Sequence, residues 1–236
     1  MVNRLIKSGF IVLLLIIFYF SIEGCQKQVE QATLDSINVY TELIKKYPAD
    51  PVYYKNRGDA YFKIERYNEA VADYQRALQI DPFDLPALRN LAAMYVKMEK
   101  YSEAIKEYDN LIRLYPTAQD YINRGNIHES FNNIPMAVTD YTKAIDMDTN
   151  NVYFYFVRGN AHDKAGNYQL SISDYTSIIN RQPTNVGARL NRGNANYNSG
   201  NYKGALEDWN IVIQQDPSFE SDLSEKMQIA KIRSSQ

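Results

Sequence analysis

The sequence NRGDAYFKIERYNEAVADYQRALQIDP, residues 56–82, decides the fold, because most of the chain consists of variations on it. The position of its glycine, Gly58, recurs at Ala92, Gly125, Gly159 and Gly193, at a nearly constant interval of about 34 residues. A period this regular predicts an architecture of stacked repeats. With Gly58 as the eighth residue of its repeat, repeats 1 to 5 are 51–84, 85–117, 118–151, 152–185 and 186–219.

Each repeat also carries a small residue at its twentieth position and an aromatic residue at its twenty-fourth. The small residues are Ala70, Ala104, Ala137, Ser171 and Ala205, and the aromatic residues are Tyr74, Tyr108, Tyr141, Tyr175 and Trp209. Small residues at the eighth and twentieth positions let two helices approach closely, and the aromatic rings fill the space where the helices diverge. Each repeat is therefore expected to form a helical hairpin that buries its apolar face by stacking on its neighbours.

Turn residues mark the expected ends of these helices. Gly166, Gly200 and Asn132 suit the left-handed residue that ends a first helix, whereas Glu65 and Glu99 fit that position less well. Proline closes the second helix of four repeats, at Pro82, Pro116, Pro183 and Pro217.

The combined pattern resembles the tetratricopeptide repeat, whose signature is W-x2-L-G-x2-Y, then A-x3-F, then P, over about 34 residues. Arginine replaces the leucine before the glycine in four repeats, at Arg57, Arg124, Arg158 and Arg192. The resemblance implies an all-α fold, a right-handed solenoid of five helix-turn-helix repeats with a capping helix at each end, at 33–50 and 220–236. The N-terminal cap resembles a second helix that lacks its first, and residues 25–32 are expected to form a polar tether.

Residues 1–24 are predicted to be a signal peptide, with Arg4 and Lys7 before a mostly apolar stretch. Gly24 and the single cysteine, Cys25, follow that stretch and resemble the lipobox of bacterial lipoproteins, although Glu23 is unusual there. This resemblance implies cleavage before Cys25 and lipidation of its thiol. The protein is thus expected to be exported and membrane-anchored in a bacterial cell envelope, at the outer membrane or cell surface. The alternatives are an uncleaved signal anchor, with the repeats outside the cytoplasm, and ordinary secretion.

Charge and the lack of known catalytic motifs exclude several classes of function. The formal net charge of −2 argues against a nucleic-acid partner, which needs a basic stripe. The sequence contains no phosphate-binding loop, nucleophile elbow or spaced metal ligands, so we predict no cofactor, no metal site and no catalytic residue. His128 and His162 occupy the same position in adjacent repeats and form the alternative, a catalytic or metal-binding pair.

The resemblance also implies that the first helices line a concave groove, with their sixth and ninth positions facing into it. The predicted peptide-binding residues at these positions are Asn56, Asp59, Asn90, Asn123, Asn126, Asn160, Asn191 and Asn194. An asparagine amide offers a donor and an acceptor, as the main chain of an extended peptide requires. In the alternative interpretation, these residues cap helices, are solvated or bond to neighbouring repeats.

Two further sets of residues carry expectations. Arg57, Arg124, Arg158 and Arg192 each precede an aspartate by the same interval, which predicts structural ion pairs with Asp73, Asp140, Asp174 and Asp208. Apolar residues are expected either to make the groove more apolar in the later repeats or to pack against the C-terminal cap; these are Ile122, Tyr153, Phe156, Leu190 and Tyr197.

The sequence therefore predicts a non-catalytic lipoprotein that binds a protein or peptide segment and acts as a scaffold or adaptor for an envelope complex. A periplasmic or surface receptor for a peptide or glycan is the first alternative, and an enzyme that uses the two histidines is the second.

Overall fold

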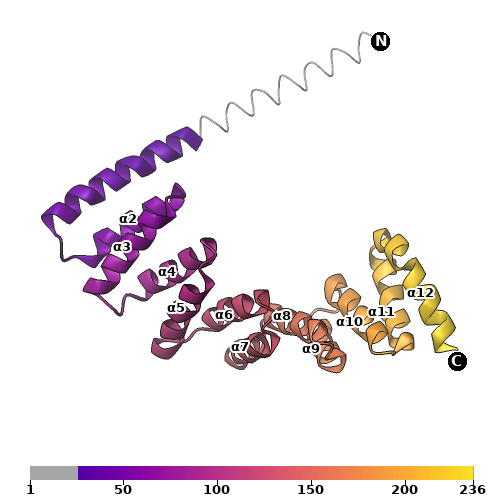
Figure 1. Ribbon diagram of the computed structural model, residues 1–236. Coiled ribbons are helices and arrows are strands. Elements are labelled where there is room, and N and C mark those ends of the chain that lie inside the picture. The colour runs from indigo at the N-terminus through magenta and orange to yellow at the C-terminus, as the bar shows by residue number, and fades with distance from the viewer. Residues whose placement is uncertain (1–25, 236) are drawn as a thin grey trace, which may run out of the picture. The chain divides into compact units, whose positions relative to one another are not determined.

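A computed structural model describes residues 26–235, and this part of the chain contains helices and turns but no strand (Figure 1). A helix over residues 26–46 comes first. The elements that follow are α2 (Pro51–Lys63), α3 (Tyr67–Ile80), α4 (Leu85–Lys97), α5 (Tyr101–Leu114), α6 (Ala118–Ser130), α7 (Ile134–Met147), α8 (Val152–Lys164), α9 (Tyr168–Arg181), α10 (Val186–Asn198), α11 (Tyr202–Gln215), the 3₁₀ helix η1 (Pro217–Phe219) and α12 (Glu220–Ser234). Each predicted repeat begins with one helix and ends with a second, which confirms the all-α prediction.

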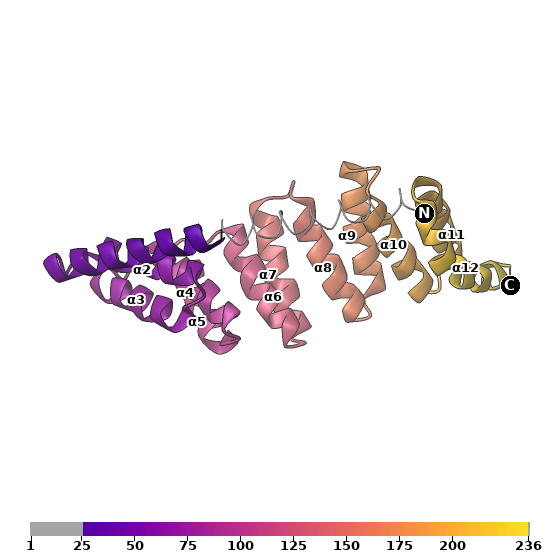
Figure 2. The same cartoon turned by 90° about the horizontal axis from the view of Figure 1, so that it is seen from above.

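The described residues form two compact bodies, 26–107 and 108–235. In the first, α2 packs on α3, and α3 packs on α4. In the second, α6 with α7, α8 with α9 and α10 with α11 form hairpins, and contacts of α7 with α8, α9 with α10 and α11 with α12 stack them in chain order (Figure 2).

The glycine at the eighth position allows the two helices of a hairpin to meet. A Cβ atom on Gly58 would lie 2.9 Å from the ring of Tyr74, and one on Gly125 would lie 2.6 Å from the ring of Tyr141. These separations are shorter than van der Waals contact, so the aromatic ring at the twenty-fourth position occupies the space that a side chain would need. The structure therefore supports the helix-packing role inferred for the small residues.

All three expected turn residues adopt the left-handed conformation, with φ of 58° at Asn132, 74° at Gly166 and 85° at Gly200. Glu65 and Glu99 adopt it as well, with φ of 60° and 57°. The turn between the two helices therefore imposes this conformation even on residues that do not favour it.

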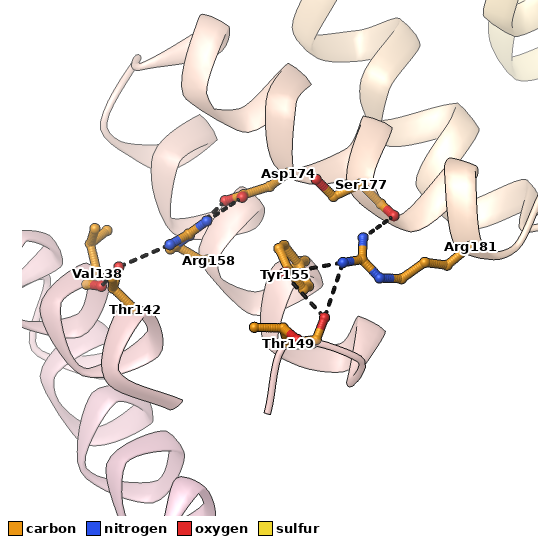
Figure 3. Close-up of polar contacts among 8 residues, drawn as sticks. All are labelled: Val138, Thr142, Thr149, Tyr155, Arg158, Asp174, Ser177 and Arg181. Carbon is orange, nitrogen blue, oxygen red and sulfur yellow. Dashed lines mark hydrogen bonds and ion pairs between the residues drawn. The ribbon is translucent and has the colours of Figure 1, made fainter. Parts of the chain in front are cut away.

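The arginine at the seventh position holds neighbouring helices together. Arg158 donates from Nε and Nη2 to Asp174, at 3.0 and 2.6 Å, and from Nη1 to the hydroxyl of Thr142 in the preceding repeat, at 3.1 Å (Figure 3). We call this three-way contact the arginine fork. It recurs at Arg57 with Asp73 and Thr41, at Arg192 with Asp208 and Thr176, and at Arg124 with Asp140 and Asp109. The predicted ion pairs are confirmed, and the bond to the preceding repeat is an additional finding.

The N-terminal helix is longer than expected. Residues 26–32, which fall in the predicted tether, are helical and continuous with the cap, and the helix ends at residue 46. Glutamine, glutamate and alanine in this stretch favour a helix, and the Thr33 hydroxyl donates to the carbonyl of Val29 at 2.8 Å. The tether prediction is therefore wrong for 26–32, whereas Cys25 and the predicted signal peptide lie outside the described residues.

Candidate functional site

The ninth position of the first helix accepts a hydrogen bond from the tyrosine at the twenty-fourth position. In repeat 3, the Tyr141 hydroxyl donates to Asn126 Oδ1 at 2.8 Å, and in repeat 4 Tyr175 donates to Asn160 Oδ1 at 2.8 Å. In repeat 1, Tyr74 donates to Asp59 at 2.7 Å. The side-chain oxygen at this position therefore orients the tyrosine that fills the hairpin.

The asparagines at the sixth position form hydrogen bonds with other side chains of the protein. Asn90 Nδ2 donates to Asp59 of the preceding repeat at 2.7 Å, and Asn191 Nδ2 donates to Asn160 at 3.3 Å. Asn123 accepts a bond from Gln119 at 2.8 Å, and Asn56 accepts one from Lys55 at 3.0 Å. The bonds of Asn90 and Asn191 link neighbouring repeats, whereas those of Asn123 and Asn56 stay within their own helix, and all four use only part of the amide.

The unused hydrogen-bond donors are the amide nitrogens of the asparagines at the ninth position. Within the described part of the chain, Nδ2 of Asn126 and Nδ2 of Asn160 make no hydrogen bond, and Asn126 is exposed. Each of these donors can bond to a carbonyl oxygen of a ligand without disturbing the bond from tyrosine.

Repeat 5 departs from this scheme. Trp209 replaces the tyrosine, and its Nε1 atom is buried with no partner among residues 26–235. The Oδ1 atom of Asn194, at the ninth position, is likewise buried and unpartnered. A buried acceptor without a partner is costly, and because this atom is buried, a ligand in the groove does not reach it.

In repeats 3 and 4, a carboxylate at the twelfth position accepts a second bond from the tyrosine, and sequence reasoning missed it. Tyr141 also donates to Glu129 at 2.7 Å, and Tyr175 donates to Asp163 at 3.0 Å. Burial and these carboxylates raise the pKa of both tyrosines. The constant interval along the chain between carboxylate and tyrosine was the available signal. Glu129 also pairs with Lys164 of the next repeat.

The five apolar residues have different locations. Ile122 is completely buried in the hydrophobic core, so it does not face the groove, because helix α6 turns it inward. Phe156 lies edge-on to Tyr175 at 6.2 Å between ring centroids. Leu190 and Tyr197 pack against the cluster that includes α12, which agrees with the packing alternative. Tyr153 is 49% exposed and remains accessible.

The two histidines differ in their burial. His162 is buried, its Nδ1 atom has no partner, and burial lowers its pKa. His128 is half-buried. Among residues 26–235, no group of three or more histidine, cysteine, aspartate or glutamate side chains could hold a metal ion, and no helix is long and apolar enough to cross a membrane.

Family models for the tetratricopeptide repeat match residues 51–84, 87–120 and 156–218, which together are more than half of the chain. The chain is a tetratricopeptide repeat protein. This assignment agrees with the hairpins and with the small and aromatic positions described above. Members of this family are typically non-catalytic modules for protein interaction.

Solved structures show the same fold. The crystal structure of YrrB, described as a tetratricopeptide repeat protein with an unusual peptide-binding site, matches with a TM-score of 0.68 and 21% identity over 79% of this chain and 97% of its own. A crystal structure of MamA protein matches with a TM-score of 0.65 and 20% identity over 73% of this chain and 94% of its own.

Relatives in sequence match over single short stretches. The small glutamine-rich tetratricopeptide repeat-containing protein 2 of Saccharomyces cerevisiae is 45% identical over 47 residues, 20% of this chain and 14% of its own length. The Hsp70-Hsp90 organizing protein 2 of Arabidopsis thaliana is 38% identical over 53 residues, 22% of this chain and 9% of its own. The similarity therefore spans only a small part of these relatives.

Proposed function

We propose that the protein is a non-catalytic binding protein that holds an extended segment of a partner protein along the first helices α6, α8 and α10. The family supports a protein-interaction role, and the ninth-position residues supply the chemistry. The observation that carries the proposal is that Asn126 and Asn160 accept from tyrosine through Oδ1 and leave Nδ2 without a bond among residues 26–235.

The proposed contacts use the peptide main chain. Asn126 and Asn160 would donate from Nδ2 to carbonyl oxygens of the segment. Main-chain recognition leaves the choice of partner to neighbouring side chains such as Tyr153, which is accessible.

We further propose that the protein is exported and anchored by lipid on Cys25, so that the bound partner belongs to an envelope complex that this protein helps to assemble. The support is the resemblance of residues 1–25 to a lipoprotein signal. A variant with Cys25→Ser should then move from the membrane fraction to the soluble fraction. Unchanged membrane association of this variant would favour the uncleaved signal anchor.

The peptide proposal is tested by replacing Asn126 and Asn160 with aspartate. Aspartate keeps the oxygen that accepts from tyrosine, as Asp59 does in repeat 1, but removes the Nδ2 donor. The matched control replaces Asn180 and Asn210 with aspartate. Both residues are exposed on second helices, so the control changes the net charge by the same amount as the test variant.

We expect the first variant to lose partners that the native protein captures by crosslinking in the intact envelope, and the control to retain them. Circular dichroism would verify that both variants fold. Equal capture by the two variants would refute the proposed role of the ninth position.

A further inference from the structure

The N-terminal helix has the register of a second helix. Thr41 accepts from Arg57 at 3.1 Å, as Thr142 accepts from Arg158 and Thr176 accepts from Arg192. Pro48 also precedes Pro82 by the length of one repeat. Residues 33–46 therefore correspond to the second helix of a repeat that would begin at residue 17, and Ser36, Val39 and Tyr40 occupy its twentieth, twenty-third and twenty-fourth positions.

The face that a first helix would cover is open in the described part of the chain. In repeat 1 the twentieth and twenty-third positions, Ala70 and Asp73, are 0% and 5% exposed, whereas Val39 is 57% exposed. Apolar and small residues continue along the helix at alternating spacings of three and four, at Val29, Ala32, Ser36, Val39 and Leu43. This spacing forms a stripe suited to packing against another helix.

A hollow of about 190 Å³ lies between the N-terminal helix and α2, the first helix of repeat 1. It is lined by Thr33, Ser36, Tyr40, Asn56, Asp59, Ala60 and Lys63. Two of these residues lie where complete repeats contact the preceding first helix. Asn56 corresponds to Asn90 and Asn191, which donate to the ninth position of the preceding repeat. Lys63 corresponds to Lys164, which pairs with the twelfth position of the preceding repeat.

We propose that this face docks a single amphipathic helix from a partner protein, which occupies the place of the first helix that residues 26–235 do not supply. The complete repeats define its side chains. A glycine or alanine must face Tyr40, since a Cβ on Gly58 or Gly125 would crowd its tyrosine ring and the largest residue at this position in the five repeats is Ala92. The residue before it must be apolar, because Val39 occupies the position at which repeats 1, 3, 4 and 5 have the aspartate that binds arginine.

Two polar contacts add further requirements for the sequence of the docked helix. An asparagine or aspartate directly after the small residue would accept from Asn56 Nδ2, and an acidic residue three positions later would pair with Lys63. The expected sequence is therefore apolar, Gly or Ala, Asn or Asp, two unspecified residues, then Asp or Glu. This surface lies in the N-terminal body, so it is separate from the peptide site proposed on α6, α8 and α10.

A second copy of this chain fits the face poorly. Helix α12 is a first helix with no second helix after it within the described residues, and its seventh to ninth positions are Lys226, Met227 and Gln228. The lysine would face Val39 and the methionine would collide with Tyr40. A partner with the motif above is therefore the preferred occupant.

The test uses two synthetic peptides taken from repeat 3, residues 117–132, TAQDYINRGNIHESFN. One carries Arg124→Leu, which creates the motif, and the other keeps the arginine. Full-length protein in detergent micelles is titrated into each fluorescent peptide, and anisotropy reports binding. We expect the leucine peptide to bind roughly tenfold more tightly, because an arginine against Val39 loses its solvation without gaining a carboxylate.

Val39→Asp should reverse this preference, because it restores the carboxylate found in the complete repeats. Leu170→Asp, an equivalent change at an exposed position of α9, should leave the preference unchanged. Three results would overturn the proposal: no binding of either peptide, equal affinities for the two peptides, or an unchanged preference in Val39→Asp. The first would also result if residues before 26 filled the face. Self-association in light scattering that Val39→Asp abolishes would assign the face to a second copy instead.

Discussion

Replacement of only the arginine of an arginine–aspartate pair should destabilise the protein more than replacement of both residues of the pair. Arg158→Leu would leave the carboxylate of Asp174, which is 3% exposed, without its two guanidinium bonds. Breaking such a pair costs about 3–5 kcal/mol, and the partial exposure of Arg158 favours the lower end, about 3 kcal/mol. The double variant with Asp174→Leu should cost about 1 kcal/mol, because leucine at both positions leaves no unpaired charge.

The measurement is a double-mutant cycle from urea denaturation followed by far-ultraviolet circular dichroism, fitted with coupling between neighbouring repeats. The coupling energy between Arg158 and Asp174 should exceed about 2 kcal/mol. Leu91 occupies the seventh position of repeat 2, so the hairpin already accommodates leucine there. The exposed pair of Lys143 and Asp146 serves as the control and should show almost no coupling. Additive effects of the two substitutions would refute the reasoning.

Three further substitutions test the packing, the turns and the buried histidine. Gly193→Val should lower stability by about 2–3 kcal/mol in thermal melting, since its Cβ would lie 2.7 Å from the ring of Trp209, whereas Gly187→Val should cost much less, because its nearest neighbour lies at 3.6 Å. Glu65→Gly should raise the free energy of unfolding by about 0.5–1 kcal/mol, because φ of 60° suits glycine; a loss would contradict this account of the turn. Burial lowers the pKa of His162, so the unfolded chain binds more protons just below the ordinary histidine pKa of about 6.5, and stability should fall as the pH drops through that range. His162→Asn should flatten this dependence in denaturation curves measured across the range, and an unchanged slope would exclude His162 as its source.

The hairpins were predictable from sequence because their packing depends on residue types at fixed positions. Gly58 with Tyr74 and Arg158 with Asp174 are separated by the same interval along the chain, and that spacing is sufficient to place them on facing helices. Local propensity was less informative. Glu65 takes a left-handed conformation because the bonds of the turn require it, and residues 26–32 are helical because they extend an established helix.

The candidate site was less accessible to sequence reasoning. A row of asparagines has the same appearance whether it binds a ligand or links repeats, and only the bonds of Asn126 and Asn160 show that oxygen and nitrogen differ in use. Ile122 was expected at the groove because periodicity gives its helix but not the direction in which it faces. The unpartnered Asn194 depends on Trp209, whose indole replaces a hydroxyl donor.

The absence of a fork in repeat 2 has a consequence for the order in which the chain opens. At the junction of α3 and α4, a neutral bond of 2.9 Å from Gln75 to Tyr95 stands where other junctions have a charged contact. Amide protons of α4 should therefore exchange with solvent sooner than those of α8 or α10, and a protease added under native conditions should cut there first. A single leucine at position 91 would then set where degradation of this protein begins.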